Sequence, residues 1–173
     1  MLLTSDFVDD CLDQNRRLDP EKYVLVDKEF EAGSGYTMAR SLAEAAVNKG
    51  QLLKSYTIYC TDGARGGYDN LASIATANGA TCTPFRGRAG ADAALRHALE
   101  DTDSDAEAKP EEVLLLSGTT AQEAKIWPKF IQMVEKHGKI PRIIQADWLL
   151  HAALEQRLQP IEPHALSEEN IDG

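Results

Sequence analysis

The sequence lacks the features of a membrane or secreted protein. It has no apolar run close to the roughly 18 to 20 residues that a membrane-spanning helix needs. Its first residues, MLLTSDFVDD, have no basic flank followed by a long apolar stretch, so they do not predict a secretory signal. Cysteine is scarce, because Cys11, Cys60 and Cys82 are odd in number and lack metal-ligand spacing. We therefore expect small buried thiols in a reducing compartment, and no membrane partner.

Positive charge is also in short supply. The chain has 18 Lys and Arg against 28 Asp and Glu, and its formal net charge is −10. Such a surface repels a phosphate backbone, so we expect no sequence-independent DNA binding by the whole surface, although a local group of cations can still hold one phosphate. We also expect no direct, sequence-specific nucleic-acid partner. The histidines have no partner at ligand spacing, so we expect no metal and no cofactor. These histidines are His97, His137, His151 and His164.

Common enzyme motifs are missing as well. The Gly-rich stretch TDGARGGYDN at 61–70 has neither the G-x-G-x-x-G spacing nor the G-K-[ST] ending of nucleotide-binding loops. The sequence also has no G-x-S-x-G elbow. We therefore expect that the protein is not an enzyme. A small nucleotide-binding α/β enzyme domain remains as an alternative, and nucleotide binding in a thermal-shift assay would favour it.

What is present is an alternation of strand and helix patterns. Helical spacing with Leu71, Ile74 and Ala75 on one face follows the first strand pattern, and two longer helical patterns cover 120–136 and 147–156. The β-branched or apolar runs typical of buried strands are 56–60, 80–85, 113–116 and 141–145. The predicted order is therefore β-α-β-β-α-β-α.

The helix boundaries carry recognisable signals. Gly79 and Gly138 stop the first two helices, because glycine tolerates the left-handed backbone of a helix end. Thr120 and Glu123 have the spacing of a capping box at the start of the second helix. Pro128 inside this helix predicts a kink or a restart.

Two segments lie outside this pattern. The stretch DTDSDAEAKPEE at 101–112 is acidic and poor in apolar residues, so we expect a mobile loop there. Residues 91–99 have helical spacing and predict a short extra helix. Near the N-terminus, residues 39–47 predict a linker helix.

The N-terminal segment 6–20 resembles the segment 147–160. Each begins with an Asp expected to cap a helix and an aromatic residue, runs about three turns and ends near Arg-Leu-x-Pro. A short apolar piece follows each of them. The pattern indicates a repeated unit, and two ordinary amphipathic helices are the alternative.

Several of these pieces resemble the BRCT domain. One is the aromatic residue that opens the last helix, in Ala146-Asp147-Trp148-Leu149, and another is the small-residue turn at 74–80. More narrowly, some short stretches resemble the C-terminal repeat of fungal multi-BRCT scaffolds of the DNA-damage response, the relatives of the yeast regulator of Ty1 transposition. These stretches are IYCT at 58–61, GGYD at 66–69, PFRGR at 84–88 and WPKF at 127–130.

This resemblance implies a fold and a division into domains. The fold is a three-layer α/β fold, with a four-stranded parallel sheet in the order 2-1-3-4, one helix on one face and two on the other. The expected segments are the closing helix and tail of a preceding BRCT-like repeat (1–26), a linker with a helix (27–53), a complete BRCT domain (54–166) and a disordered tail (167–173).

A phosphate site can be placed on the residues themselves. Thr61 ends the first strand beside the Gly-rich turn, so its hydroxyl and the amides of Asp62 and Gly63 can point at one anion. A cation from the second long helix, Lys129 or Lys125, completes the site. BRCT domains that read phosphopeptides use such a Ser or Thr, the next amide and a Lys of the second helix. Lys129 is preferred over Lys125 because the number of residues between it and Trp148 is closer to the spacing in the BRCT family.

The resemblance also implies a function. It predicts a non-enzymatic interaction module in the nucleus that binds a phosphorylated Ser or Thr partner, such as a histone tail, and other repair proteins. Arg65, Arg86 and Arg88 are weaker candidates for flanking that peptide. The alternative is a structural repeat that binds an unmodified peptide or a neighbouring repeat, because the Asp62 carboxylate would repel an anion unless it turns away.

Overall fold

The protein divides into two compact units, Met1–Val47 and Asn48–Gly173. The structure, a computed structural model, describes residues 3–87 and 112–171. The expected helix at 91–99, most of the acidic loop and Arg88 lie outside the described residues. None of the described helices is long and apolar enough to cross a membrane.

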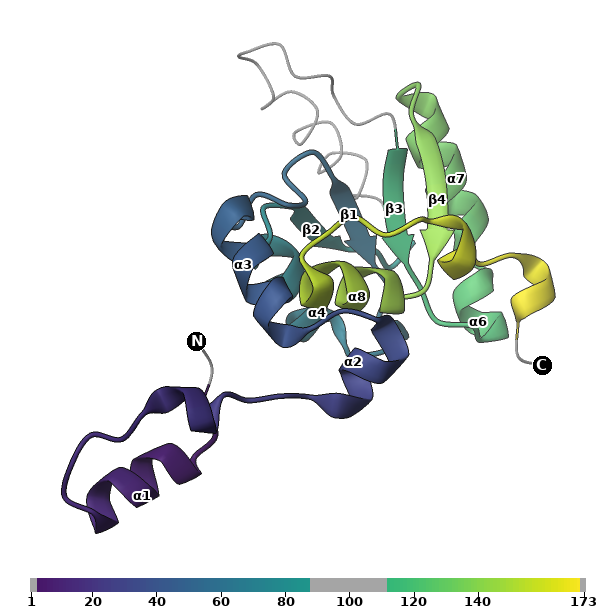
Figure 1. Ribbon diagram of the computed structural model, residues 1–173. Coiled ribbons are helices and arrows are strands. Elements are labelled where there is room, and N and C mark those ends of the chain that lie inside the picture. The colour runs from purple at the N-terminus through teal and green to yellow at the C-terminus, as the bar shows by residue number, and fades with distance from the viewer. Residues whose placement is uncertain (1–2, 88–111, 172–173) are drawn as a thin grey trace. The chain divides into compact units, whose positions relative to one another are not determined.

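A parallel sheet with the strand order β2-β1-β3-β4 forms the centre of the larger unit (Figure 1). Neighbouring strands pair in parallel throughout this sheet. The predicted strands and their predicted order are therefore confirmed. The strand bounds are β1 (Thr57–Cys60), β2 (Thr81–Pro84), β3 (Glu112–Leu116) and β4 (Ile140–Ile144).

Helices cover both faces of the sheet. On one face, α4 (Tyr68–Ala77) and α8 (Asp147–Glu155) pack around Trp148. On the other face, α7 (Trp127–Lys136) packs Phe130 against the side chains of β1 and β3 that point to that side. The expected arrangement of one helix on one face and two on the other is confirmed. β1 and β3 are buried on both faces, which explains why their sequences read as apolar runs.

The second long helix is broken in two. α6 (Ala121–Ala124) ends before α7, which restarts with Pro128 in its first turn, where a missing N–H costs nothing. Thr120 caps α6, because its hydroxyl accepts a hydrogen bond from the Glu123 amide at 3.3 Å. Of the predicted capping box, the hydrogen bond from the Glu123 amide to the Thr120 hydroxyl is therefore confirmed.

The two predicted Asp caps are wrong. Asp6 and Asp147 are the first helical residues, and the N-cap positions hold Ser5 and Ala146 without a side-chain cap. Each helix begins one residue earlier than the Asp pattern suggested. A carboxylate in the first turn still stabilises a helix through the helix dipole.

Gly79 and Gly138 both end helices in the left-handed conformation. The amide of Gly79 donates to the Thr76 carbonyl at 3.0 Å, and the amide of Ala80 donates to the Ala75 carbonyl at 3.0 Å. Gly138 and its successor make the same pair of bonds at the end of α7. Both helix stops predicted from glycine are confirmed.

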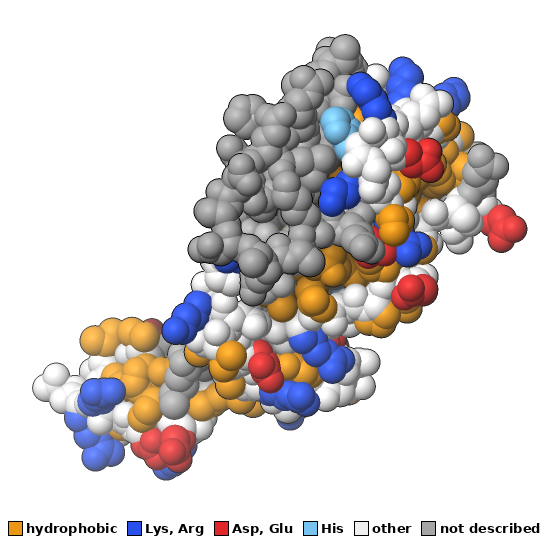
Figure 2. All heavy atoms as spheres, turned by 90° about the horizontal axis from the view of Figure 1, so that it is seen from above, with side chains coloured by type: hydrophobic (Ala, Val, Ile, Leu, Met, Phe, Trp, Pro, Cys, Tyr) orange, Lys and Arg blue, Asp and Glu red, His pale blue; other side chains and the backbone are white. Residues whose placement is uncertain are grey.

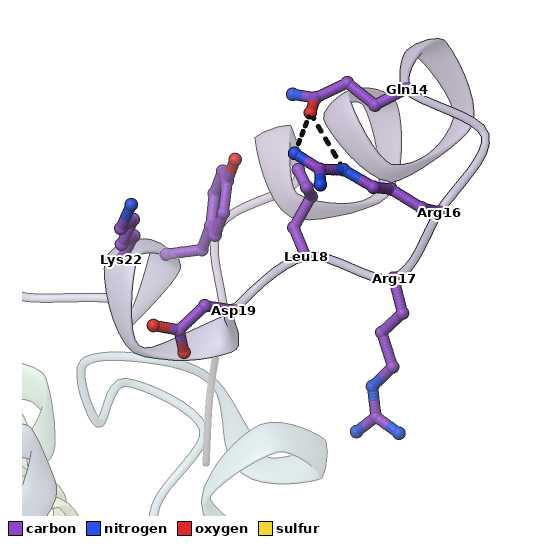
Figure 3. Close-up of a pocket in the computed structure, with 7 residues that line it drawn as sticks. Gln14, Arg16, Arg17, Leu18, Asp19 and Lys22 are labelled. Atoms are coloured by element: carbon purple, nitrogen blue, oxygen red, sulfur yellow. Dashed lines mark hydrogen bonds between the residues drawn. The ribbon is translucent and has the colours of Figure 1, made fainter.

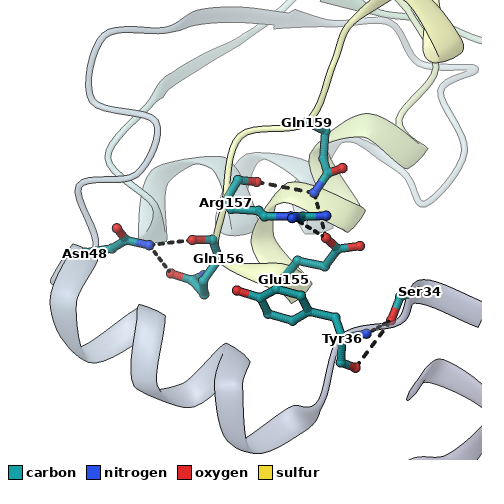
Figure 4. Close-up of polar contacts among 7 residues, drawn as sticks. All are labelled: Ser34, Tyr36, Asn48, Glu155, Gln156, Arg157 and Gln159. Atoms are coloured by element: carbon teal, nitrogen blue, oxygen red, sulfur yellow. Dashed lines mark hydrogen bonds and ion pairs between the residues drawn. The ribbon is translucent and has the colours of Figure 1, made fainter. Parts of the chain in front are cut away.

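A polar network holds the end of α8 (Figure 4). Gln156 adopts a left-handed backbone with φ of 55°, and its carbonyl accepts a hydrogen bond from Asn48 Nδ2 at 2.7 Å. Glu155 is a buried carboxylate that accepts from Arg157 Nε and Gln159 Nε2, each at 2.9 Å. These partners satisfy the buried charge and fix the chain as it leaves the helix.

The smaller unit is helical. An isolated antiparallel bridge joins Leu3 to Val24, and the rings of Phe7 and Tyr23 meet edge to face at 5.4 Å. A helix is present where the linker helix was expected, as α3. The bounds are α1 (Asp6–Asp13), η1 (Pro20–Tyr23), α2 (Lys28–Ser34) and α3 (Met38–Asn48). The larger unit ends with η2 (Glu162–His164) and η3 (Glu168–Asn170).

Candidate functional site

The carboxyl ends of β1, β2 and β3 meet at one edge of the sheet. Cys60, the last residue of β1, is in register with Pro84 of β2 and Leu116 of β3. The amide of Thr61 donates to the Leu116 carbonyl at 2.9 Å, which continues the ladder by one residue. Thr61 and Ser117 therefore leave the sheet side by side, where ligands of open α/β sheets bind.

Thr61 carries an unsatisfied hydroxyl. The residue is 0% exposed, and its Oγ1 makes no hydrogen bond within the part of the chain that the structure describes. Leaving a buried hydroxyl without a partner costs about 1–3 kcal/mol. An orphan of this kind indicates a ligand or a water molecule at the site.

Asp62 turns its carboxylate to a cation. Arg86, in the segment after β2, holds it through several hydrogen bonds, with Nε 3.0 Å from Oδ2. Hydrogen bonding to Asp62 raises the pKa of Arg86. The repulsion expected between Asp62 and an anion is thus reduced, and Arg86 is brought to the same edge of the sheet as Thr61.

The two candidate lysines have different positions. Lys129 lies in the first turn of α7, and its Nζ is 3.4 Å from the carbonyl oxygen of Gly87, in the same segment as Arg86. Lys125 is the exposed residue at the end of α6. Arg65, with a side chain 84% exposed, is 3.6 Å from Asp147 at the start of α8. The structure therefore brings Lys129 and Arg86 to this edge, and the phosphate-binding role of all these residues stays a prediction.

Glu123 is the residue of this region that the sequence did not reveal. A Cβ atom on Gly63 would lie 2.7 Å from Glu123 Oε1, so the carboxylate packs directly on the turn after β1. Its Oε2 lies 3.4 Å from Ser117 Oγ, which accepts a 2.9 Å hydrogen bond from the Trp127 indole. The capping pattern gave Glu123 a purely local role. A negative charge beside the Gly-rich turn opposes the binding of an anion.

The charge at this edge also acts on a thiol. The pKa of Cys60 is raised to about 12, first by burial and further by Cys82, Glu123 and Asp62. Only the thiolate is a good nucleophile, so this thiol is inert at neutral pH. Cys60 is therefore a structural residue of the site and not a reactive one.

A pocket in the smaller unit has a basic lining (Figure 3). Its volume is about 380 Å³. The Arg16 guanidinium turns back to Gln14, with Nη2 3.0 Å from Oε1, whereas Arg17 points away. The lining residues are Gln14, Arg16, Arg17, Leu18, Asp19, Lys22 and Tyr23. None of the residues predicted for the phosphate site lines it.

The described residues outside this edge of the sheet form no metal-binding cluster. Among residues 3–87 and 112–171, no group of three or more His, Cys, Asp or Glu is placed to hold a metal ion. Acidic, basic and apolar side chains are interspersed on the face that Figure 2 shows. The edge of the sheet at Thr61 is therefore the best candidate site in the described part of the larger unit.

The chain resembles a known BRCT-containing protein in sequence. No protein-family model matches the chain. Over 159 residues it is 26% identical to BRCT-containing protein 1 of Schizosaccharomyces pombe, in an alignment that covers 91% of this chain and 17% of that protein. The chain thus spans less than a fifth of the length of this relative.

Solved structures show the same fold. The crystal structure of the S. pombe Brc1 BRCT5-BRCT6 domains matches with a TM-score of 0.65 and 25% identity, covering 96% of this chain and 72% of that one. The complex of Rtt107p with a phosphorylated histone matches with a TM-score of 0.55 and 17% identity, covering 95% and 64%. The sheet order and the helix layers described above are those of these domains.

Proposed function

We propose that the larger unit is a protein-interaction module that binds a phosphorylated Ser or Thr in a partner protein. Its fold is that of the BRCT domains of fungal multi-BRCT scaffolds of the DNA-damage response, to which it is similar. The phosphate would lie at the carboxyl end of β1. Thr61 Oγ1, the amides of Asp62 and Gly63 and the ammonium of Lys129 would contact it. The proposed role is non-catalytic and nuclear.

The orphan hydroxyl of Thr61 carries this proposal. A phosphate oxygen is a strong acceptor, so it would satisfy a buried O–H that has no partner among the described residues. Lys129 and Arg86 place two cations at the same edge of the sheet, in a protein with a net charge of −10. A phosphorylated histone tail is a suitable first partner to test, because Rtt107p, which shares the fold, forms a complex with a phosphorylated histone.

A second candidate function follows from Glu123. Its carboxylate lies against Gly63, within the region that the phosphate would approach. This observation favours a repeat that binds an unmodified peptide or a neighbouring repeat. The two functions differ in one measurable quantity, the ratio of affinities for unphosphorylated and phosphorylated forms of the same peptide.

Replacing Lys129 with methionine is expected to remove the preference for a phosphorylated histone-tail peptide. A hydrogen bond to a charged group contributes about 1.5–3 kcal/mol, which corresponds to a loss of roughly ten- to hundredfold in affinity for the phosphorylated form. Fluorescence anisotropy with matched phosphorylated and unphosphorylated peptides measures both affinities. Lys125→Met is the matched control and should leave the preference intact.

Thr61→Val separates the site from the fold. Because the hydroxyl is buried without a partner among the described residues, the variant is expected to be at least as stable as the parent protein while losing phosphate preference. If the parent protein shows no preference for the phosphorylated peptide, the phosphate proposal is wrong and the second function is supported. If Lys125→Met rather than Lys129→Met removes the preference, the cation has been misassigned.

Glu123→Gln is expected to increase affinity for the phosphorylated peptide. Removing one like charge near the phosphate at the protein surface is worth about 1 kcal/mol, or roughly fivefold. The same titration at low and high salt measures it, and the gain should shrink as salt screens the charges. Glu135→Gln, an exposed change on α7, is the control. An equal gain in both variants would mean that only net charge matters, and that Glu123 has no special position at the site.

A further inference from the structure

The smaller unit repeats the closing part of the larger unit at a constant register. An isolated antiparallel bridge joins Leu3 to Val24, and another joins Ile144 to Ala165. The two bridged residues are 21 positions apart in each case, and 141 positions separate Leu3 from Ile144. Each bridge closes over one α-helix followed by a short 3₁₀ helix.

Backbone conformation follows the same register. α1 begins at Asp6 and α8 begins at Asp147, three residues after the bridge in both units. Asn15 and Gln156, again 141 positions apart, adopt the left-handed conformation with φ of 46° and 55°. A non-glycine residue seldom adopts this conformation, so its recurrence at matching positions is specific.

Hydrogen bonds recur at matching positions as well. The amide of Thr4 donates to the Tyr23 carbonyl at 2.8 Å, and the amide of Gln145 donates to the His164 carbonyl at 2.9 Å. Both bonds tie the residue after the bridge to the last residue of the 3₁₀ helix. The two closing segments therefore share one backbone path.

A side-chain contact follows the same register. Arg16 Nε is 3.3 Å from Gln14 Oε1 (Figure 3), and Arg157 Nε is 2.9 Å from Glu155 Oε2 (Figure 4). The Arg-Leu-x-Pro pattern had instead aligned Arg17 with Arg157. In the structure the position of Arg16 corresponds to that of Arg157, 141 residues later. The same separation of 141 residues therefore relates all the matching features of the two segments.

The apolar faces of the two helices differ in what covers them. In α8, Trp148, Leu149 and Ala152 are each 0% exposed, because they pack against α4 and the sheet. Their counterparts in α1 are Phe7, Val8 and Cys11.

The face of α1 is only partly covered. Val8, the counterpart of Leu149, is 57% exposed, Phe7 and Cys11 are half-buried, and α1 has no fully buried residue. Leu25 is 40% exposed, whereas its counterpart Leu166 is 8% exposed. The described part of the smaller unit has no sheet on which this face could pack. A helix of eight residues is marginal in water without such packing.

We propose that residues 3–25 are the closing segment of a second BRCT repeat, and that the apolar face of α1 docks on the sheet-and-helix face of a BRCT repeat that has no closing helix of its own. Phe7, Val8 and Leu25 occupy the places that Trp148, Leu149 and Leu166 occupy in the larger unit. A second copy of this chain is not the occupant, because α8 already covers that face of its sheet.

A graft tests the proposal in the full chain. Residues 145–166 are replaced by the sequence of residues 4–25, which keeps the length and the register and leaves Thr61 and Lys129 unchanged. The graft is expected to retain one cooperative thermal transition, at a lower Tm than the parent because Phe and Val replace Trp and Leu. Circular dichroism and Trp127 fluorescence follow the transition.

A graft shifted by one residue, with residues 5–26 in the same place, is the matched control and should lose the cooperative transition. A third graft carries Phe7→Trp and Val8→Leu, which restore the side chains of the parent core. If the in-register grafts unfold cooperatively and the shifted graft does not, the proposal is supported. If the third graft also has no transition, or if the shifted graft is as stable as the in-register one, the proposal is overturned.

Discussion

Replacing Trp148 with alanine is expected to lower the free energy of unfolding of the larger unit by about 3–5 kcal/mol, the usual cost of removing a large buried aromatic side chain. Trp148 is 0% exposed and lies between α8 and the sheet. Its indole N–H donates to the Gln159 carbonyl at 2.9 Å, and its ring lies 5.5 Å from that of Tyr56. The variant loses the packing and leaves that carbonyl without its donor.

Urea unfolding measures this loss, with Trp127 as the remaining fluorophore. Trp148→Phe keeps most of the apolar volume and should cost less, whereas Leu158→Ala, at a site 50% exposed, should change stability by no more than about 0.5 kcal/mol. If the Trp148→Ala and Leu158→Ala variants unfold at the same urea concentration, the assignment of Trp148 as the central core residue is contradicted.

Replacing Gly79 with alanine is expected to cost about 2–5 kcal/mol. Its φ is +91°, a conformation that costs an L-residue about 1–2 kcal/mol. A Cβ atom there would also lie 2.8 Å from the carbonyl oxygen of Gly50, and forcing an extra carbon into such a contact costs about 1–3 kcal/mol more. Backbone cannot move aside as easily as a flexible side chain.

Gly138 provides the matched control. It ends α7 with the same pair of hydrogen bonds and a φ of +67°, but a Cβ atom there would meet no described atom within 4 Å. Gly138→Ala should therefore cost only the conformational part, about 1–2 kcal/mol. Thermal unfolding of the two variants in parallel measures the difference. Equal losses would show that the contact with Gly50 contributes nothing.

Local sequence patterns predicted some, but not all, of the residues that lie at the candidate phosphate site. Thr61 and Asp62 were placed together from the sequence because they follow the first strand at the Gly-rich turn, and the resemblance to BRCT domains added Lys129 from the second helix. Arg86 joins them, since it follows β2. Arg65, another predicted neighbour, is close to Asp147 instead, because the turn after β1 carries it toward α8.

Glu123 could not be found in this way. Its spacing from Thr120 fits a capping box, and the hydrogen bond of that cap is present. The direction of its carboxylate depends on the close approach of the loops after β1 and β3, where a Cβ atom on Gly118 would lie 2.6 Å from the Gly63 carbonyl oxygen. That approach joins residues far apart in the sequence, and no local pattern reports it.

The sequence alone predicted the order of the strands and helices, the helix ends at Gly79 and Gly138, and the buried face of α8. These features depend on local backbone preference and on the period of apolar residues. The resemblance to the BRCT domain then supplied the order of strands in the sheet. Tertiary structure was needed for the orphan hydroxyl of Thr61, the position of Glu123 and the single register that relates α1 to α8. These features depend on which distant atoms meet, and a spacing along the chain does not encode that.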